Sequence, residues 1–137
     1  MERILGLDIG TVRIGLALSD PLGITAQPLE TIQLKKCDPI ERIRELVEEY
    51  SISKLVIGNP LTLNGKSSFA SEKVAEFVEK LQKCLQLECI LWDERMTTAQ
   101  AEKLMISSGV RRQKRRESID QVASAIILQS YLDAHQS

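Results

Sequence analysis

The order in which hydrophobic periods follow one another limits the fold of this chain more than any other feature of its sequence. Three stretches typical of strands come first, at residues 3–9, 13–19 and 24–32, with turn-forming residues between them. Large apolar residues alternate with small or polar ones along 13–19, so that the two kinds have opposite faces of a strand. Pro28 favours an edge position for the third strand. The short connections predict that these strands form an antiparallel meander.

The rest of the chain alternates between helix and strand periods. Asp38 followed by Pro39 is a strong signal for a helix start, because Asp caps the first N–H groups and Pro fits the first helical position. The expected helices run over residues 38–50, 74–81, 97–109 and from about 119 to 133, and the expected strands over 54–58 and 88–92. Strands connected through helices pair in parallel. We therefore expect an α/β fold: a mixed five-stranded sheet, with a three-strand antiparallel meander and two parallel strands, flanked by helices in a single domain over residues 1–137.

Length and composition exclude several classes of protein. The 137 residues suit one domain, and no apolar run approaches the roughly 20 residues that a membrane span needs. Asp8 stands where a signal peptide would continue its apolar stretch, so a cytoplasmic location without a membrane partner is expected. The single histidine, His135, excludes catalytic triads and multi-histidine zinc sites. The three cysteines form no Cys-x-x-Cys pair, and we expect them to be unpaired, buried apolar residues.

Three acids that are far apart in the sequence can meet at one edge of the expected sheet. Asp8 lies near the carboxyl end of the first strand, Glu94 follows the last strand, and Asp120 is one residue into the final helix. Ligands of such sheets gather beyond the carboxyl ends of the parallel strands. Gly6 shares a face with Asp8, which leaves room for a ligand or another backbone to approach. Each acid also has a purely structural interpretation: a turn contact, an exposed position, or a favourable charge near a helix N-terminus.

Convergence of the three carboxylates would favour a divalent cation. Like charges at close range raise each other's pKa unless a cation compensates them. Mg²⁺ prefers oxygen ligands, and paired ions assist phosphodiester cleavage. The hypothesis is therefore Mg²⁺ or Mn²⁺ held by Asp8, Glu94 and Asp120 in a metal-dependent nuclease, a hydrolase acting on phosphodiester bonds.

Cations are concentrated just ahead of the third acid, although the formal net charge of the chain is only -1. This cluster consists of Arg111, Arg112, Lys114, Arg115 and Arg116. Both a solvated loop and a phosphate-binding loop are compatible with it. Residues 59–68 are expected to form a flexible loop at the active edge, with Lys66 available for a phosphate contact.

Four sequence blocks together span nearly the whole chain. They are Gly6–Gly10 with Arg13–Asp20, Val56–Pro60 with Asn64–Gly65, Trp92–Ala101, and Ile119–Ala123 with Ile127–Asp133. These blocks resemble those of the YqgF family, also called RuvX. The resemblance implies a ribonuclease-H-like fold. It also implies the activity of a pre-16S ribosomal RNA nuclease or of a Holliday-junction-resolvase-like enzyme.

The resemblance further implies which residues form the site. The family's three catalytic acids correspond to the three selected above, and Asp93 is the alternative to Glu94 as metal ligand. Val12 stands where the family usually has lysine, so one contact to a phosphate is in doubt. The pair Ala123-Ser124 stands where the family commonly has two alanines, and neither departure removes a metal ligand.

Processing of pre-16S ribosomal RNA is the first functional hypothesis, on resemblance alone, and resolution of branched DNA is the second. For the first hypothesis the partner is a structured RNA precursor on ribosomal particles. For the second it is a DNA junction, and symmetric cutting of its two strands favours a homodimer. Arg13, Lys66, Arg95 and the cations of residues 111–116 would position its phosphates. Two alternatives stay open. The chain could be a non-catalytic nucleic-acid-binding protein, or a fragment of an actin-like nucleotide phosphotransferase, because residues 8–11 resemble the first phosphate loop of such enzymes.

Overall fold

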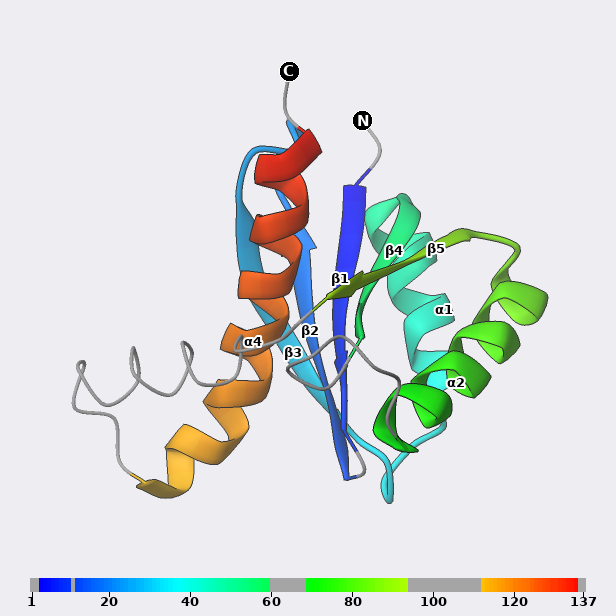
Figure 1. Cartoon of the computed structure of the whole chain (residues 1–137), viewed down its shortest axis with the longest axis vertical. Coiled ribbons are helices and arrows are strands. Elements are labelled where there is room, and N and C mark those ends of the chain that lie inside the picture. The colour runs from blue at the N-terminus through cyan, green and yellow to red at the C-terminus, as the bar shows by residue number, and fades with distance from the viewer. Residues whose placement is uncertain (1–2, 11, 60–68, 94–111, 136–137) are drawn as a thin grey trace.

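The computed structural model describes residues 3–10, 12–59, 69–93 and 112–135, without the side chains of residues 69–71, 93 and 112–121. Its centre is one five-stranded sheet (Figure 1). The strands are β1 (Arg3–Ile9), β2 (Arg13–Ser19), β3 (Ala26–Gln33), β4 (Ile52–Asn59) and β5 (Glu88–Asp93). They are arranged in the order β3-β2-β1-β4-β5.

The pairing of the strands confirms the mixed sheet that the sequence predicts. β1 pairs antiparallel with β2, and β2 antiparallel with β3. β4 pairs parallel with both β1 and β5. β3 lies at one edge, and Pro28 occupies it beside an irregularity in the register with β2, as expected for a residue without an N–H.

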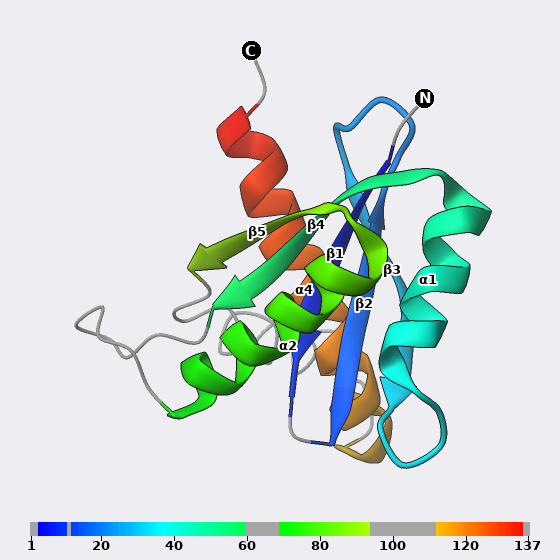
Figure 2. The ribbon, with the colours of Figure 1, turned by 90° about the vertical axis from the view of Figure 1, so that its right-hand side faces the viewer.

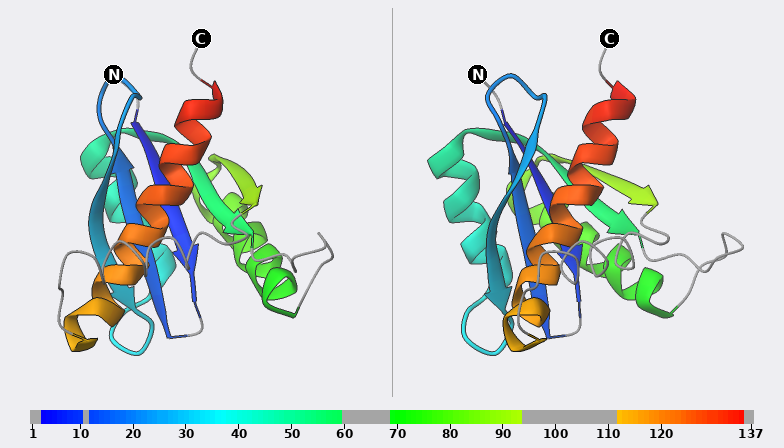
Figure 3. Two further views of the ribbon diagram at one scale, coloured as in Figure 1. Left: turned by 60° about the vertical axis from the view of Figure 1, so that its left-hand side comes forward. Right: turned by 90° about the vertical axis from the view of Figure 1, so that its left-hand side faces the viewer.

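Helices cover both faces of the sheet. The described helices are α1 (Pro39–Tyr50), α2 (Phe69–Leu85) and α4 (Arg112–His135). α1 and α2 lie on one face (Figure 2), and α4 crosses the other (Figure 3). The side chain of Asp38 accepts a hydrogen bond from the Ile40 N–H at 3.0 Å, which confirms the predicted cap of α1. None of the described helices is long and apolar enough to cross a membrane.

The alternation of each strand divides the core into two layers. Leu5 and Leu7 of β1 belong to the larger layer, which packs against α1 and α2. Ala17 and Val56 belong to the smaller layer, which packs against α4 through Ile127 and Leu128. Even-numbered residues of β1, including Asp8, therefore lie on the face that α4 covers.

Of the last two helices expected from the sequence, only the second lies in the described part of the chain. The last helix begins at Arg112 and not near Ile119, so the prediction of its start was wrong by about two turns. Arg, Lys, Gln and Glu are good helix formers, and they fill the segment that was expected to be a loop. The helix expected over residues 97–109 lies outside the described residues.

The cysteines are free, as predicted, but the expectation that they are buried was wrong for two of them. Cys37 and Cys84 are exposed, and Cys89 is half-buried. Cys37 lies in the turn before α1, and Cys84 is on the solvent side of α2. Burial raises the pKa of the Cys89 thiol to about 11.

Thiol labelling should separate these three cysteines. In the native protein at mildly alkaline pH, iodoacetamide should modify Cys37 and Cys84 first, because Cys89 is both partly covered and less ionised. Mass spectrometry should show two early labels and a third that becomes fast only in denaturant. Equal rates at all three thiols would contradict the described environment of Cys89.

Candidate active site

The carboxyl ends of β1, β4 and β5 meet at one end of the sheet, which we call the rim. Leu7 of β1 pairs with Ile57 of β4, which pairs with Leu91 of β5. One step further along these parallel strands, Asp8 comes level with Gly58, which pairs with Trp92. Asp8 therefore lies at the rim, as the sequence predicts.

Asp8 is half-buried and has a glycine on each side. Gly15 of β2 is its antiparallel partner, and Gly58 occupies the matching position on β4. Neither neighbour has a side chain that could fill the space beside the carboxylate. Neither glycine was predicted from the sequence to belong to the site. Glycine within an otherwise apolar strand was the available signal, because it commonly marks a close approach of a ligand or backbone.

α4 packs unusually close to β1 at Gly6, two residues before Asp8. A Cβ atom at Gly6 would lie 2.8 Å from the Leu128 Cβ and 3.1 Å from the Ser124 carbonyl oxygen. Any side chain at this position would therefore require α4 to move. The expectation that Gly6 admits another backbone is confirmed.

This contact fixes the register between β1 and α4. α4 runs in the opposite direction to β1 (Figure 1), so residues that precede Ser124 lie over residues that follow Gly6. Asp120 is one turn before Ser124, a rise of about 6 Å, and Asp8 is two residues after Gly6, a rise of about 7 Å. The backbone of Asp120 thus comes level with Asp8.

The other candidate ligands are described less completely. The side chain of Asp120 and the whole of Glu94 lie outside the described residues, and Asp93 is described by its backbone, as the last residue of β5. Within the described part, no three His, Cys, Asp or Glu side chains form a metal-binding group. This part includes the side chain of Asp8 but not those of its two expected partners.

α4 is also anchored at its C-terminal half, to strands on both sides. The Gln129 side chain accepts a hydrogen bond from the Ala26 N–H (2.9 Å) and donates one to the Ile24 carbonyl (2.9 Å). On the other side, the Trp92 indole N–H donates to the Ser130 hydroxyl at 3.0 Å. The Trp92 ring also meets the Tyr131 ring edge-on, with centroids 5.4 Å apart. These contacts connect α4 to the edge of β3 and to the end of β5.

The structure describes the predicted phosphate-binding residues to three different extents. Arg13 begins β2 at the rim and is half-buried, whereas Lys66, Arg95 and Arg111 lie outside the described residues. The backbones of Arg112, Lys114, Arg115 and Arg116 form the first turns of α4. The expectation of a loop was therefore wrong for the last four members of the cluster, whereas phosphate binding by them stays a prediction. Asp120 is correspondingly eight residues beyond Arg112 and not one residue into the helix.

Comparison with known proteins places the chain among nucleases and resolvases. A family model described as "RuvX: Holliday junction resolvase" matches residues 2–134. A protein of Bacillus cytotoxicus named "Putative pre-16S rRNA nuclease" is 47% identical over 135 residues, which is 96% of this chain and 98% of the relative. A protein of Bacillus mycoides with the same name is 46% identical, with the same coverage.

Solved structures show the same fold at low identity. RuvC of Thermus thermophilus, in complex with a Holliday junction substrate, gives a TM-score of 0.57 at 16% identity and covers 98% of this chain and 95% of its own. The fowlpox virus Holliday junction resolvase gives 0.56 at 16% identity, with 96% and 99% covered. The fold is therefore that of the RuvC-like, ribonuclease-H-like proteins.

Substitution of Gly6 tests the packing that brings α4 to the rim. Gly6→Ala should lower the free energy of unfolding by about 1–3 kcal/mol, because the added methyl overlaps Leu128 and Ser124. Gly6→Val should cost more, since two further methyl groups enter the same gap. Urea denaturation measures both, and a variant as stable as the native protein would contradict the close contact.

Proposed function

The chain belongs to the RuvX family, and from this premise we propose that it is a divalent-metal-dependent nuclease acting in the processing of pre-16S ribosomal RNA. The observation that carries the proposal is the register of α4 on β1, which brings the backbone of Asp120 level with Asp8 at the rim. We further propose that residues 1–137 form a single ribonuclease-H-like nuclease domain, located in the cytoplasm.

We assign the second catalytic acid to Glu94 in preference to Asp93. Ile90 and Trp92 of β5 pack in the core layer on the α4 side. Successive residues of a strand alternate between faces, so a strand that kept this period through position 94 would give Glu94 the face of Asp8 and Asp93 the opposite face. Asp8, Glu94 and Asp120 would then supply carboxylate oxygens from three elements on one side of the sheet.

The surroundings of Asp8 fit a hydrated divalent cation. The donors are oxygens, which Mg²⁺ and Mn²⁺ accept, and the flanking Gly15 and Gly58 place no side chain beside the carboxylate. Such an ion supplies positive charge, which stabilises the charge that develops on the scissile phosphate. Asp8 and Asp120 belong to a strand and a helix that pack together at Gly6, so both would hold a ligand without a loop rearrangement.

The chain's cations would bind and orient the phosphate backbone beside these acids. Arg13 lies at the rim, and the first turns of α4 carry the basic cluster over residues 112–116. We include Arg95, which is adjacent to Glu94, Arg111, which belongs to the basic cluster, and Lys66, which follows β4 in the sequence. Neutralisation of successive phosphates by such residues would fix the strand across the rim.

The substrate we propose is a structured RNA precursor, bound as part of a ribosomal particle. It rests on the relatives, which are named for pre-16S ribosomal RNA. Resolution of four-way DNA junctions is the second candidate, favoured by the description of the matching family and by the fold shared with RuvC. A resolvase has to cut two strands symmetrically, so this second function would require a homodimer.

Replacement of Asp8 should abolish metal-dependent cleavage. Asp8→Asn removes the charge but keeps the shape, and we expect cleavage of a pre-16S RNA substrate in Mg²⁺ to fall by at least about a hundredfold. Excess chelator should have the same effect on the native protein. Parallel assays on a four-way DNA junction would distinguish the two substrates.

Asp20→Asn is the matched control for this experiment. Asp20 lies at the opposite end of the sheet, where its carboxylate accepts hydrogen bonds from the N–H groups of Ile24 (2.7 Å) and Thr25 (3.0 Å). This variant should cleave like the native protein. Full activity of Asp8→Asn, or of the native protein in chelator, would refute the mechanism.

The choice between the two neighbouring acids can be tested directly. Glu94→Gln should lose cleavage to the same extent as Asp8→Asn, whereas Asp93→Asn should retain most of it, because the strand period places position 93 on the other face. Thermal melting of both variants controls for folding. The opposite ranking of the two variants would show that Asp93 is the ligand.

A further inference from the structure

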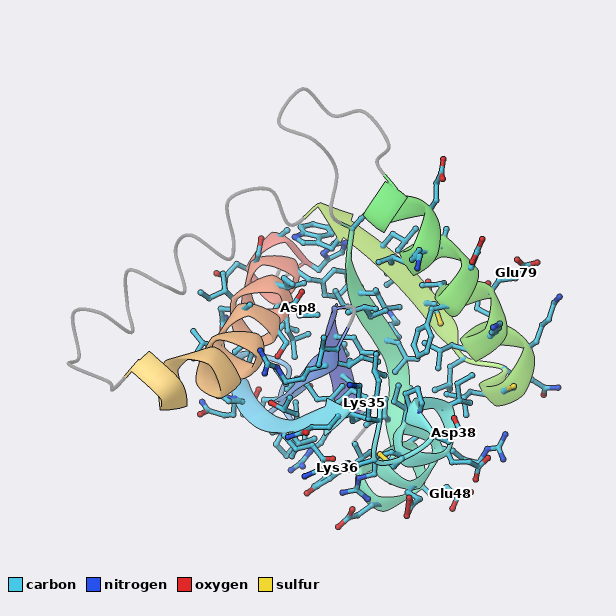
Figure 4. The ribbon with its side chains drawn as sticks, turned by 90° about the horizontal axis from the view of Figure 1, so that it is seen from below. Asp8, Lys35, Lys36, Asp38, Glu48 and Glu79 are labelled. Carbon is cyan, nitrogen blue, oxygen red and sulfur yellow. The ribbon has the colours of Figure 1, made fainter. Side chains whose placement is uncertain are left out.

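A second basic element reaches the rim, from the loop that follows β3. Since β3 is antiparallel to β2 and β2 to β1, β3 runs in the same direction as β1. Thr31 of β3 pairs with Gly15, the partner of Asp8, so the last residues of β3 extend beyond Asp8. Lys35 and Lys36 come directly after this strand. Figure 4 looks onto this end of the sheet and shows both lysines there, with Asp8 further toward α4.

The loop that carries the two lysines is held in place by backbone hydrogen bonds. The Leu34 N–H donates to the Val12 carbonyl at 3.1 Å, which connects the loop to the turn between β1 and β2. The Lys36 N–H donates to the Gln33 carbonyl at 2.9 Å. The position of both residues is thus fixed relative to the strands that form the rim, so little backbone ordering is needed when a ligand binds.

Lys35 and Lys36 have no acidic partner among the described residues, in contrast to four other described cations. Arg42 forms an ion pair with Glu30 at 2.7 Å, and Lys83 one with Glu79 at 3.6 Å. Arg44 and Lys54 have acidic partners as well. Among the described residues, the side chains of Lys35, Lys36 and Lys80 make no hydrogen bond or ion pair. Lys35 and Lys36 are exposed and adjacent, and their charges are therefore uncompensated.

The charge of the neighbouring helix limits where a polyanion can lie. α1 follows the loop and presents four exposed acids to solvent, which are Glu41, Glu45, Glu48 and Glu49. Two of these acids are paired within the helix, Glu41 with Arg44 and Glu45 with Arg42, so the excess negative charge comes from Glu48 and Glu49. This net negative charge disfavours contact with nucleic acid. A strand that contacts Lys35 and Lys36 would therefore extend away from α1, toward Asp8 and the basic first turns of α4 on the other face of the sheet.

We propose that Lys35 and Lys36 form a phosphate-binding arm for the nucleic-acid substrate. The backbone of the bound strand then crosses the rim, with the Lys35–Lys36 loop and the start of α4 contacting phosphates on either side of Asp8. This inference rests on the proposed nuclease function for its ligand, a nucleic-acid strand. Its evidence is the fixed loop and the two uncompensated charges at the same end of the sheet as Asp8.

The salt dependence of binding tests the arm without any cleavage. A fluorescein-labelled single-stranded RNA is titrated with protein in EDTA, at several KCl concentrations, and fluorescence anisotropy gives the observed association constant. Each lysine–phosphate contact contributes about 0.7 to the slope of log K against log salt on a single strand. Lys35→Ala/Lys36→Ala should therefore reduce the magnitude of the slope by about 1.4. The ratio of the association constant of the native protein to that of this variant should therefore fall about sevenfold between about 50 and 200 mM KCl.

Lys80→Ala/Lys83→Ala is the matched control, because it removes the same charge from the exposed side of α2. The slope of this variant should equal that of the native protein. An unchanged slope in Lys35→Ala/Lys36→Ala, or an equal change in the control, would overturn the proposal. Cleavage by the native protein is assayed separately. Cleavage without a change of slope in Lys35→Ala/Lys36→Ala would contradict only this inference. A change of slope without cleavage by the native protein would contradict only the proposed nuclease function.

Discussion

The contact between α4 and Gly6 is the constraint on which the candidate site depends. Asp8 and Asp120 are more than 100 residues apart in the sequence. Their side chains can share a ligand only if β1 and α4 lie at a fixed distance and in a fixed register. The absence of a side chain at Gly6 permits the close distance, and the Ser124 carbonyl and Leu128 set the register. Gln129 and Trp92 then hold the far half of α4, so that the helix cannot slide along the sheet.

Much of the fold could be predicted because its signals are local. The alternation along β2, the Asp38-Pro39 cap and the edge proline of β3 each act within a few residues, and the structure has all three. The start of α4 could not be predicted in this way, because residues 112–118 have high helix propensity but no apolar period to reveal them. The exposure of Cys37 likewise depends on which side of a turn meets solvent.

The site was predictable in part for a related reason. Asp8 stands out because an acid near the end of an apolar strand is costly without a partner, and its position at the rim follows from strand order. The flanking Gly15 and Gly58 were not recognised, since their role appears only when three strands are aligned. The same holds for Lys35 and Lys36. Two lysines in a turn are ordinary in a sequence, and their lack of acidic partners is a property of the fold.

The anchoring of α4 on β3 has a consequence for the exposed flank of the sheet. An unpaired outer strand is a template onto which another chain can add and begin aggregation. Here Pro28 offers no N–H, and the Ala26 N–H and Ile24 carbonyl are already occupied by the Gln129 amide. A foreign strand would have to displace a side chain that also holds the helix. The residue that positions α4 thus protects the protein from edge-to-edge polymerisation along β3.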